Sequence, residues 1–405
     1  MMDYRRIAHI LILLFLVVGV MIPGVGHAQA EIDITPQDPS YTFGDYINFN
    51  ASILFTGVID EVLLFVQIDG DTDIQVHPVS VDSQGNLSFE LNVKESPLRA
   101  FSDVEYWYQV NFEHGETYTS PRYSFYYGDN RFQWNLLEGP PFRIHWYAGD
   151  VSHGEEVLNV ALEGLSSSQK YLDVFFPETV DIYVYDAPQA IQDALPDAEQ
   201  NWIAGHADPD QGVILVSLPP GAERHLEMER QIPHELMHIA LYYTDAHAYS
   251  NLPTWFNEGL ASLAELYPNP EYQALIESAY DSGSLFPLAS LCQTFPNASQ
   301  DALLAYAQSA SFTQFLYDQY GNPGFNRLLA AYASGMSCER GIEEALGSDL
   351  VNLEGSWRRE NFADQAWMKT YEEFLPWIIL LLVVLVGPLI LVLAVIRNRS
   401  ARMEL

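Results

Sequence analysis

The pentapeptide 234–238, which reads H-E-L-M-H, constrains this chain more than any other stretch. It lies in an apolar run, residues 231–243, that is compatible with a helix. A spacing of four places His234 and His238 on one helical face, one turn apart, where both imidazoles can reach the same cation. Glu235 lies beside them, where its carboxylate can accept a proton from a water that the cation activates.

Glu258 is the candidate for a third ligand. Catalytic zinc usually has three protein ligands and one open position, so two histidines leave the set one short. Glu258 follows His238 by twenty positions, in a helical segment that reads N-E-G-L-A. We therefore expect one zinc ion held by His234, His238 and Glu258. The alternative is a structural helix whose histidines satisfy core groups, but such polar side chains are costly to bury unpaired.

The first thirty residues predict a secretory signal peptide. Arg5 and Arg6 precede an apolar run, and the segment ends in the small-residue pattern Ala28-Gln29-Ala30. The alternative for residues 1–30 is an uncleaved N-terminal anchor.

Residues 376–396 predict a transmembrane helix. They are almost wholly apolar and long enough to cross a bilayer. Three arginines follow in the tail, residues 397–405, so the positive-inside rule places that tail in the cytoplasm. We expect a single-pass type I protein of the cell membrane with an extracytoplasmic body. A buried core helix is the alternative.

Charge and cysteine content exclude other classes. The formal net charge is −36, with 54 acidic and 18 basic side chains, so the body should repel nucleic acid and anionic lipid. Cys292 and Cys338 are the only cysteines, and both fall on the expected external side, where thiols oxidise. We expect one disulfide between them. Neither has a C-x-x-C neighbour, which argues against a zinc-thiolate or redox role.

Residues 31–128 predict an all-β sandwich. Short alternating segments are separated by turn clusters, and they cover 46–53, 61–68, 87–93, 104–112 and 123–127. The segment 104–110 with Ser120-Pro121 resembles the last two strands of fibronectin type III or immunoglobulin-like modules. We expect this domain to position the body or to contact cell-surface partners.

Residues 129–373 predict a second domain, a mixed sheet followed by a helical subdomain. The expected strands cover 142–147, 180–185, 202–206 and 212–218, the last as an edge strand beside the cleft. The expected helices cover 155–172, 188–194, 224–243, 255–267, 270–281, 299–320, 322–334, 339–346 and 350–373.

The zinc motif and its surroundings resemble the gluzincin zinc metallopeptidases. Residues 255–265, W-F-N-E-G-L-A-S-L-A-E, look like the second-ligand helix of the aminopeptidase N branch, and the chain is similar to the bacterial peptidase MA-like proteins over about 140–365. The resemblance implies His234, His238 and Glu258 as ligands and Glu235 as the catalytic base.

The resemblance also implies Tyr306 as a donor to the oxyanion, because it aligns with the tyrosine of a Y-x-K-G pattern. Gln308 and Ser309 replace the lysine and glycine of that pattern, and an ordinary packed tyrosine is the alternative.

Asn257 and Glu265 are candidates for orienting the ligand histidines. For Glu265, two helical turns beyond Glu258, a plain surface carboxylate is the alternative. Thermolysin-like relatives carry an aspartate four positions after the ligand glutamate, where this chain has Ser262.

The expected activity is hydrolysis of a peptide or protein substrate by a membrane-anchored enzyme. Aminopeptidases of this clan carry a G-x-M-E-N strand that anchors the free amine, and no such motif precedes His234, which favours an endopeptidase. One alternative is a catalytically silent, peptidase-like surface binding or adhesion protein that keeps its metal structurally. Another is hydrolysis of non-peptide amides.

Overall fold

The computed structural model describes residues 32–195 and 205–401. The expected signal peptide, 1–30, lies outside the described residues. The chain forms two compact units, Met1–Arg131 and Phe132–Leu405, and each is described by itself.

The first unit contains two antiparallel sheets. One has the order β1-β3-β7-β6 with β2 also paired to β3, and the other has the order β10-β8-β4-β5 with β9 paired to β8. The strands are β1 (Asp33–Pro36), β2 (Ser40–Thr42), β3 (Tyr46–Leu54), β4 (Ile59–Ile68), β5 (Ile74–Pro78), β6 (Ser80–Val81), β7 (Asn86–Asn92), β8 (Ser102–Phe112), β9 (Thr117–Thr119) and β10 (Tyr123–Tyr127). The five segments expected from alternation correspond to β3, β4, β7, β8 and β10. The five strands that alternation missed are short, with at most five residues each.

Aromatic side chains join the two sheets into one core. The ring of Phe49 on β3 lies 5.1 Å from that of Tyr106 on β8 and 6.0 Å from that of Phe125 on β10. Alternate residues of β3 are buried, as expected for a strand with one face in a core.

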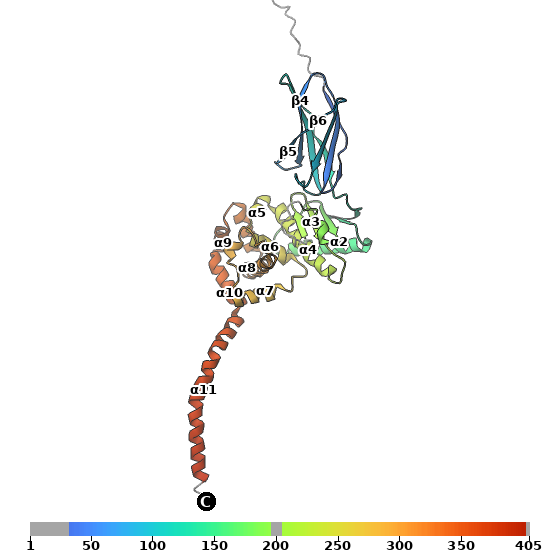
Figure 1. Cartoon of the computed structure of the whole chain (residues 1–405). Coiled ribbons are helices and arrows are strands. Elements are labelled where there is room, and N and C mark those ends of the chain that lie inside the picture. Colours follow the sequence, from blue (N-terminus) through green and yellow to red (C-terminus); the bar gives the residue numbers. More distant parts are fainter. Residues whose placement is uncertain (1–31, 196–204, 402–405) are drawn as a thin grey trace, which may run out of the picture. The chain divides into compact units, whose positions relative to one another are not determined.

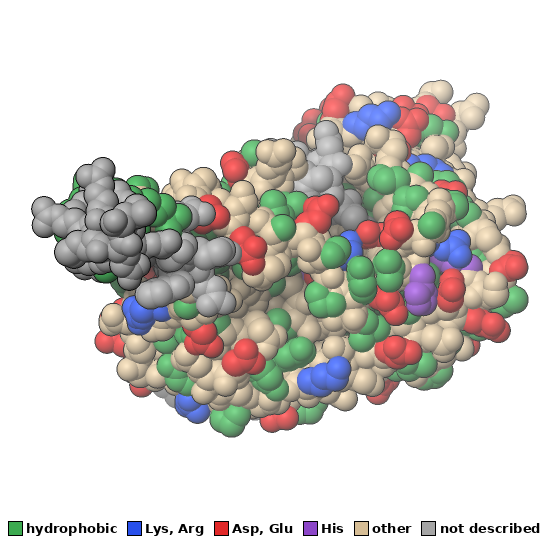
Figure 2. Space-filling model, turned by 90° about the horizontal axis from the view of Figure 1, so that it is seen from below, with side chains coloured by type: hydrophobic (Ala, Val, Ile, Leu, Met, Phe, Trp, Pro, Cys, Tyr) green, Lys and Arg blue, Asp and Glu red, His purple; other side chains and the backbone are tan. Residues whose placement is uncertain are grey.

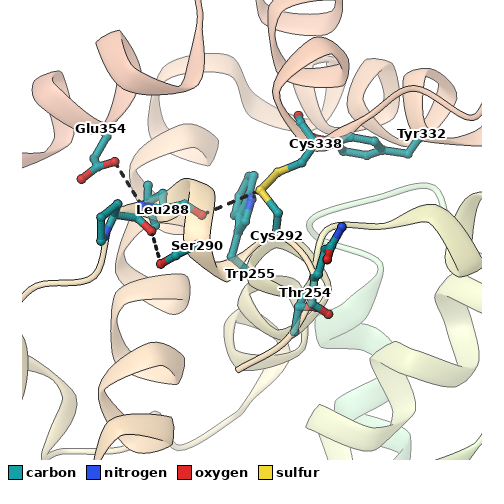
Figure 3. The surroundings of a disulfide bond; sticks show 10 residues. Thr254, Trp255, Leu288, Ser290, Cys292, Tyr332, Cys338 and Glu354 are labelled. Atoms are coloured by element: carbon teal, nitrogen blue, oxygen red, sulfur yellow. Dashed lines mark hydrogen bonds between the residues drawn. A yellow bond between two sulfur atoms is a disulfide. The ribbon is translucent and has the colours of Figure 1, made fainter. Parts of the chain in front are cut away.

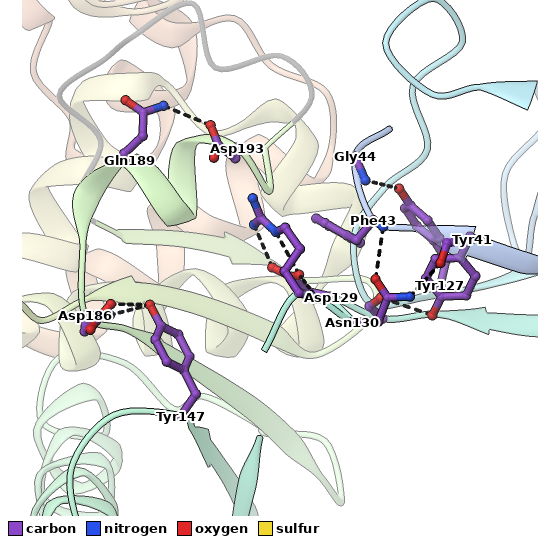
Figure 4. A network of polar contacts seen from close by, with 12 residues as sticks. Tyr41, Phe43, Gly44, Tyr127, Asp129, Asn130, Tyr147, Asp186, Gln189 and Asp193 are labelled. Atoms are coloured by element: carbon purple, nitrogen blue, oxygen red, sulfur yellow. Dashed lines mark hydrogen bonds and ion pairs between the residues drawn. The ribbon is translucent and has the colours of Figure 1, made fainter. Parts of the chain in front are cut away.

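Polar contacts hold the end of this unit against its beginning (Figure 4). Asn130 accepts a hydrogen bond from the amide of Phe43 at 3.0 Å and donates one to the carbonyl of Tyr41 at 2.8 Å. The hydroxyl of Tyr127 accepts a bond from the amide of Gly44 at 2.8 Å. These bonds close the last strand of the first unit onto residues 41–44.

The second unit begins with a mixed five-stranded sheet of order β11-β12-β13-β15-β14. The central pairs β12–β13 and β13–β15 are parallel, and the two outer pairs are antiparallel. The strands are β11 (Asn135–Gly139), β12 (Phe142–Trp146), β13 (Val180–Tyr185), β14 (Gly205–Asp208) and β15 (Val213–Ser217).

The expectation that residues 212–218 form the edge strand is wrong. They form β15, which has neighbours on both sides, and β14 is the edge strand on that side of the sheet. Every residue of β15 is buried, as in a strand covered on both faces. Residues 202–204 of the strand expected over 202–206 lie outside the described residues.

The rest of the second unit is helical, and α6 and α8 lie at its centre (Figure 1). Its helices are α2 (Val151–Ser168), α3 (Pro188–Gln192), α4 (Arg224–Thr244), α5 (Ala246–Asn251), α6 (Thr254–Ala264), α7 (Tyr272–Ser282), η1 (Leu288–Leu291), α8 (Ser299–Ala333), α9 (Cys338–Leu346), α10 (Leu350–Asn361) and α11 (Ala363–Ala401). α2 and α4 cover one face of the sheet, where Val157, Ile232 and Ile182 share one core. A second core surrounds Trp255, Phe256 and Phe312.

Several helix boundaries differ from expectation, and α2 begins at Val151 and ends at Ser168 where a helix over 155–172 was expected. The break expected between the helices 299–320 and 322–334 is confirmed: it lies at Gly321 within α8, where the φ of 57° is non-helical and readily adopted only by glycine. The helix expected over 350–373 is interrupted at Phe362. α6 ends at Ala264 rather than at residue 267, so Glu265 is the first residue beyond it.

Among the described residues, one helix is long and apolar enough to cross a membrane. This is the stretch Phe374–Ala394 of α11, with a mean hydropathy of 3.1 and no buried residue in its most apolar window. Figure 2 shows acidic side chains scattered over one face of the molecule rather than gathered in one patch. That distribution fits a general solvating charge better than a single acidic binding surface.

Candidate metal centre

Helix α4 carries the first two candidate ligands. Pro233 lies inside this helix, and its ring packs on α2 at Gly164, where an added Cβ would come within 3.0 Å of the proline. This close contact sets the position of the following turn. His238 and Glu235 are buried there, and His234 is partly buried.

The imidazoles of α4 and the carboxylate of α6 converge. Oε2 of Glu258 lies 3.3 Å from Nε2 of His234 and 3.7 Å from Nε2 of His238. One ligand atom from each of the three side chains lies within 4.8 Å of the others. A tetrahedral zinc ion with bonds of about 2.1 Å would hold its ligand atoms about 3.4 Å apart. Two nitrogens and one carboxylate oxygen at these separations could hold such an ion.

The other nitrogen of each imidazole also has a partner. Nδ1 of His234 lies 3.0 Å from Oε1 of Glu265, and Nδ1 of His238 lies 3.1 Å from Oδ1 of Asn257. Both partners are acceptors, so each Nδ1 donates its proton; Nε2 of His238 then keeps a lone pair toward Glu258, and Nε2 of His234 offers one once that ring has lost its additional proton. This arrangement of outer acceptors is characteristic of metal-binding histidines.

Glu265 lies next to His234 because α6 ends at Ala264, one residue earlier. The amide of Leu266 donates to the carbonyl of Glu229 on α4 at 2.9 Å, which turns the chain toward α4. Glu265 is 7% exposed, so it is not the plain surface carboxylate that sequence reasoning left open.

Charges in the centre favour a cation. Burial opposes the charged imidazolium, but hydrogen bonds to Glu258 and Glu265 outweigh it and raise the pKa of His234 well above its usual value. Burial lowers the pKa of His238, which keeps that ring neutral. Burial also opposes ionisation of Glu258, but its electrostatic interaction with the imidazole of His238 and the hydrogen bond from His234 outweigh burial and lower its pKa.

Glu235 is the buried carboxylate next to the three candidate ligands. Burial raises its pKa to about 7, which suits a group that gains and loses a proton near neutral pH. Its carboxylate lies against the edge strand β14. A Cβ built on Gly205 would lie 2.6 Å from Oε1 of Glu235, so this glycine leaves the space that the carboxylate fills.

Tyr306 on α8 lies beside the same group. Its ring is 6.2 Å from that of His234, and its hydroxyl interacts with Glu258. Burial, followed by the nearby negative charge of Glu258, raises the pKa of Tyr306 well above its usual value, so the hydroxyl keeps its proton. Gln308, which replaces the lysine of the Y-x-K-G pattern, is fully buried and bonds both the amide and the carbonyl of Phe286.

A disulfide supports the start of α6. Cys292 and Cys338 are joined, with their Cα atoms 6.0 Å apart, and the indole of Trp255 lies 3.3 Å from Sγ of Cys338 (Figure 3). The amide of Thr254 donates to the carbonyl of Cys292 at 2.9 Å. The disulfide thus contacts the first residues of α6, the helix that carries Glu258.

Two residues of the centre escaped sequence reasoning. Gly205 falls within the strand expected over 202–206, and no role was predicted for it. Tyr249 on α5 has its ring 6.5 Å from that of His238 and interacts with Asn257, the acceptor for that histidine. No local pattern connects either residue with the zinc motif, because both approach it through tertiary contacts.

A family model matches the part of the chain that contains this centre. The family model described as Peptidase MA superfamily matches residues 161–363, half of the chain. No curated protein sequence matches the chain.

Some solved structures are similar in shape. An aminopeptidase N family protein from Idiomarina loihiensis is 9% identical, covers 78% of this chain and 72% of its own, and has a TM-score of 0.36. The sensor domain of the anti-sigma factor RsgI4 from Pseudobacteroides cellulosolvens is 13% identical, with 24% and 94% covered and a TM-score of 0.20. The carbohydrate-binding module BhCBM56 is 13% identical, with 23% and 91% covered and a TM-score of 0.18. Scores this low carry no conclusion about activity.

The family match contains all three candidate ligands, Glu235 and Tyr306. The chain belongs to the Peptidase MA superfamily.

Proposed function

We propose that this protein is a membrane-anchored, extracytoplasmic zinc metallopeptidase that hydrolyses peptide bonds. The observation that carries the proposal is the pair of imidazoles whose Nδ1 atoms are occupied by Glu265 and Asn257 while both Nε2 atoms face Glu258. His234, His238 and Glu258 would hold the zinc ion. When bound, zinc supplies a Lewis acid that polarises a carbonyl and makes water acidic near neutral pH.

Glu235 acts as the general base. Its carboxylate accepts the proton of the attacking water and passes it to the leaving amine, and a pKa of about 7 suits both transfers. Tyr306 keeps its proton and donates a hydrogen bond to the oxygen on which negative charge develops. Asn257 and Glu265 hold the imidazoles in position.

An extended peptide beside β14 would present its backbone to Glu235. β14 is one of the two edge strands of the sheet in the described part of the chain, and Gly205 on it lies against that carboxylate. Peptides often add to exposed sheet edges through backbone hydrogen bonds. Together with the lack of an amine-anchoring motif in the sequence, this favours an endopeptidase.

The proposed organisation follows from the two units and the apolar helix. A cleaved signal peptide (1–30), an immunoglobulin- or fibronectin-like sandwich (31–128), the peptidase domain (129–373), a transmembrane helix (376–396) and a cytoplasmic tail (397–405) make a type I protein. The disulfide supports an oxidising, external location for the body. The sandwich positions the enzyme or contacts partners at the cell surface.

The substitution Glu235→Gln tests the proposal. It removes the base and preserves the shape, so zinc content should stay at one per chain while cleavage of a peptide library falls by at least about a hundredfold. Glu223→Gln, at an exposed position before α4, is the matched control and should change neither quantity. Bound zinc with no cleavage by the unaltered chain would instead support the silent binding protein. Unchanged turnover in Glu235→Gln would refute the role of Glu235.

A further inference from the structure

The ring of Phe295 packs against that of Tyr306, the candidate donor to the oxyanion. The two ring centroids lie 4.9 Å apart, and the ring planes are nearly perpendicular, at 87°. Aromatic pairs favour such an edge-to-face arrangement, because the positive edge of one ring meets the negative face of the other. Tyr306 belongs to α8, whereas Phe295 belongs to the loop 292–298 between η1 and that helix. The loop therefore folds back so that its aromatic side chain reaches the metal centre.

The loop that carries Phe295 is fixed where it begins (Figure 3). The amide of Thr254 donates to the carbonyl of Cys292 at 2.9 Å, and its hydroxyl donates to the carbonyl of Gln293 at 2.7 Å. Cys292 is also one end of the disulfide. Pro296 comes next after Phe295, and a residue before a proline is restricted to extended backbone conformations. Few backbone conformations are thus open to Phe295.

The side chain of Phe295 is fixed as well. It is partly buried and packs on the hydrophobic core around Trp255 and Phe312. A ring that is held by this core and by an anchored loop is a firm support for whatever lies against it. The side chain that lies against it is Tyr306.

The position of the Tyr306 hydroxyl depends on the orientation of its ring. The ring lies 6.2 Å from that of His234, and the hydroxyl interacts with Glu258. The hydroxyl is at the far end of the side chain, so a small rotation near the backbone moves it further than any other atom of the ring. A displacement of about 1 Å at a reacting group can cost about a hundredfold in rate. A contact that limits this rotation therefore affects catalysis.

We propose that Phe295 is a positioning residue for Tyr306, whose hydroxyl it holds in the orientation that meets the substrate oxygen. The inference rests on the role proposed above for Tyr306 as a donor to the developing negative charge. Phe295 acts through the tyrosine and touches neither substrate nor metal. A residue that only fills the core would have an effect that does not depend on the hydroxyl of Tyr306. Two residues that act as a unit are instead non-additive, and this difference can be measured.

A double-mutant cycle on the full chain in detergent tests the proposal. Phe295→Leu removes the ring and keeps an apolar side chain. With a peptide that the unaltered chain cleaves, it should lower kcat about tenfold and change KM by less than about twofold, because the bond from Tyr306 forms in the transition state. In the Tyr306→Phe background, the same substitution should change kcat by less than about twofold, because the displaced hydroxyl is absent. Phe295→Tyr keeps the ring and should retain kcat within about twofold.

The same cycle can be read from binding, without catalysis. A phosphinic peptide carries a tetrahedral phosphorus group with oxygens in place of the reacting carbonyl. Its affinity for the zinc-loaded chain, measured by calorimetry, should fall about tenfold in Phe295→Leu and by less than about twofold when Tyr306→Phe is already present. Zinc content should stay at one per chain in every variant.

The matched control is Phe65→Leu in the first unit. It removes a partly buried ring from another aromatic pair, whose partner Trp107 lies 5.2 Å away. This variant should leave kcat, KM and phosphinic-peptide affinity unchanged. Thermal unfolding followed by circular dichroism establishes that each variant is folded at the assay temperature.

Equal losses in both backgrounds would show that Phe295 acts through the fold and not through Tyr306, and they would overturn the proposal. Unchanged kcat in Phe295→Leu or in Tyr306→Phe would also overturn it. A chain that binds zinc and cleaves no peptide would contradict the proposed function by itself, and the binding cycle would then decide the role of Phe295. In that cycle, affinities that differ equally in both backgrounds, or no binding by the unaltered chain, would count against it.

Discussion

The carboxylate of Glu235 fills the space that a side chain on Gly205 would need, since an added Cβ would lie 2.6 Å from its Oε1. The clashing atom is the far end of a flexible side chain, so the glutamate can move aside without disturbing the backbone. We therefore predict that Gly205→Ala lowers peptide turnover by about 100-fold, because the base is displaced from the reacting atoms. Zinc content and melting temperature should stay close to those of the unaltered chain.

The matched control for this substitution is Gly221→Ala. A Cβ at Gly221 would meet nothing within 4 Å. Its turnover should be unchanged, and equal losses in both variants would show that the effect of Gly205→Ala is not local.

Zinc binding should release protons, and more of them at lower pH. The raised pKa of His234 means that its ring carries a proton in the metal-free chain, and this proton must leave before Nε2 can bind a cation. Glu235, with a pKa of about 7, is also protonated below that pH and loses its proton beside a cation. Zinc affinity should therefore rise as pH increases from 6 to 8.

Calorimetry in two buffers of different ionisation enthalpy measures this release. At pH 6, Glu235→Gln should release about one proton fewer than the unaltered chain, and at pH 8 the two should converge. An identical release at pH 6 would show that Glu235 is already ionised without metal.

Removing the acceptor of His238 should weaken the metal site. Asn257→Ala leaves Nδ1 of His238 without its partner at 3.1 Å, and loss of such an outer contact typically costs 10–100-fold in metal affinity. Competition with a chromogenic chelator measures the affinity. Asn251→Ala, which removes a helical asparagine bonded to the carbonyl of His247, is the control and should leave zinc affinity unchanged.

Loss of the disulfide should affect both stability and metal binding. The bridge closes a loop of 46 residues, and its removal in Cys292→Ala/Cys338→Ala should lower the free energy of unfolding by about 4 kcal/mol. Zinc affinity should also fall, because the carbonyl of Cys292 accepts from the amide of Thr254 at the start of α6. Chemical denaturation and chelator competition measure the two effects. A reductant should lower both the free energy of unfolding and the zinc affinity of the unaltered chain, and it should change neither quantity in the variant.

Much of the ligand arrangement could be predicted because it depends on local geometry. A spacing of four on a helix brings His234 and His238 to one face whatever surrounds them. To predict Glu258 as the third ligand, it was enough to recognise a second helix at a short distance along the chain. The strands of the first unit in which apolar and polar residues alternate clearly, such as β3 and β10, could also be predicted from local sequence.

What could not be predicted depends on contacts between distant segments. The end of α6 is determined by the bond from Leu266 to the carbonyl of Glu229, which no propensity of residues 255–267 indicates. The prediction of an edge strand over 212–218 was wrong because β15 has only five residues, and periodicity over so short a segment does not reveal that both its faces are buried. The importance of Gly205 is visible only once Glu235 is placed beside it.

All the acceptors on the imidazoles come from one short piece of chain. Asn257, Glu258 and Glu265 lie within nine consecutive positions, 257–265, in α6 and just beyond its end, and in the described structure they contact both histidines of α4. These two segments are joined by the main-chain bond between Leu266 and Glu229 and by the core that α4 and α6 share, and together they form a transferable unit. A helical scaffold that reproduced this pairing would be a starting point for building an artificial hydrolase without the remainder of the molecule.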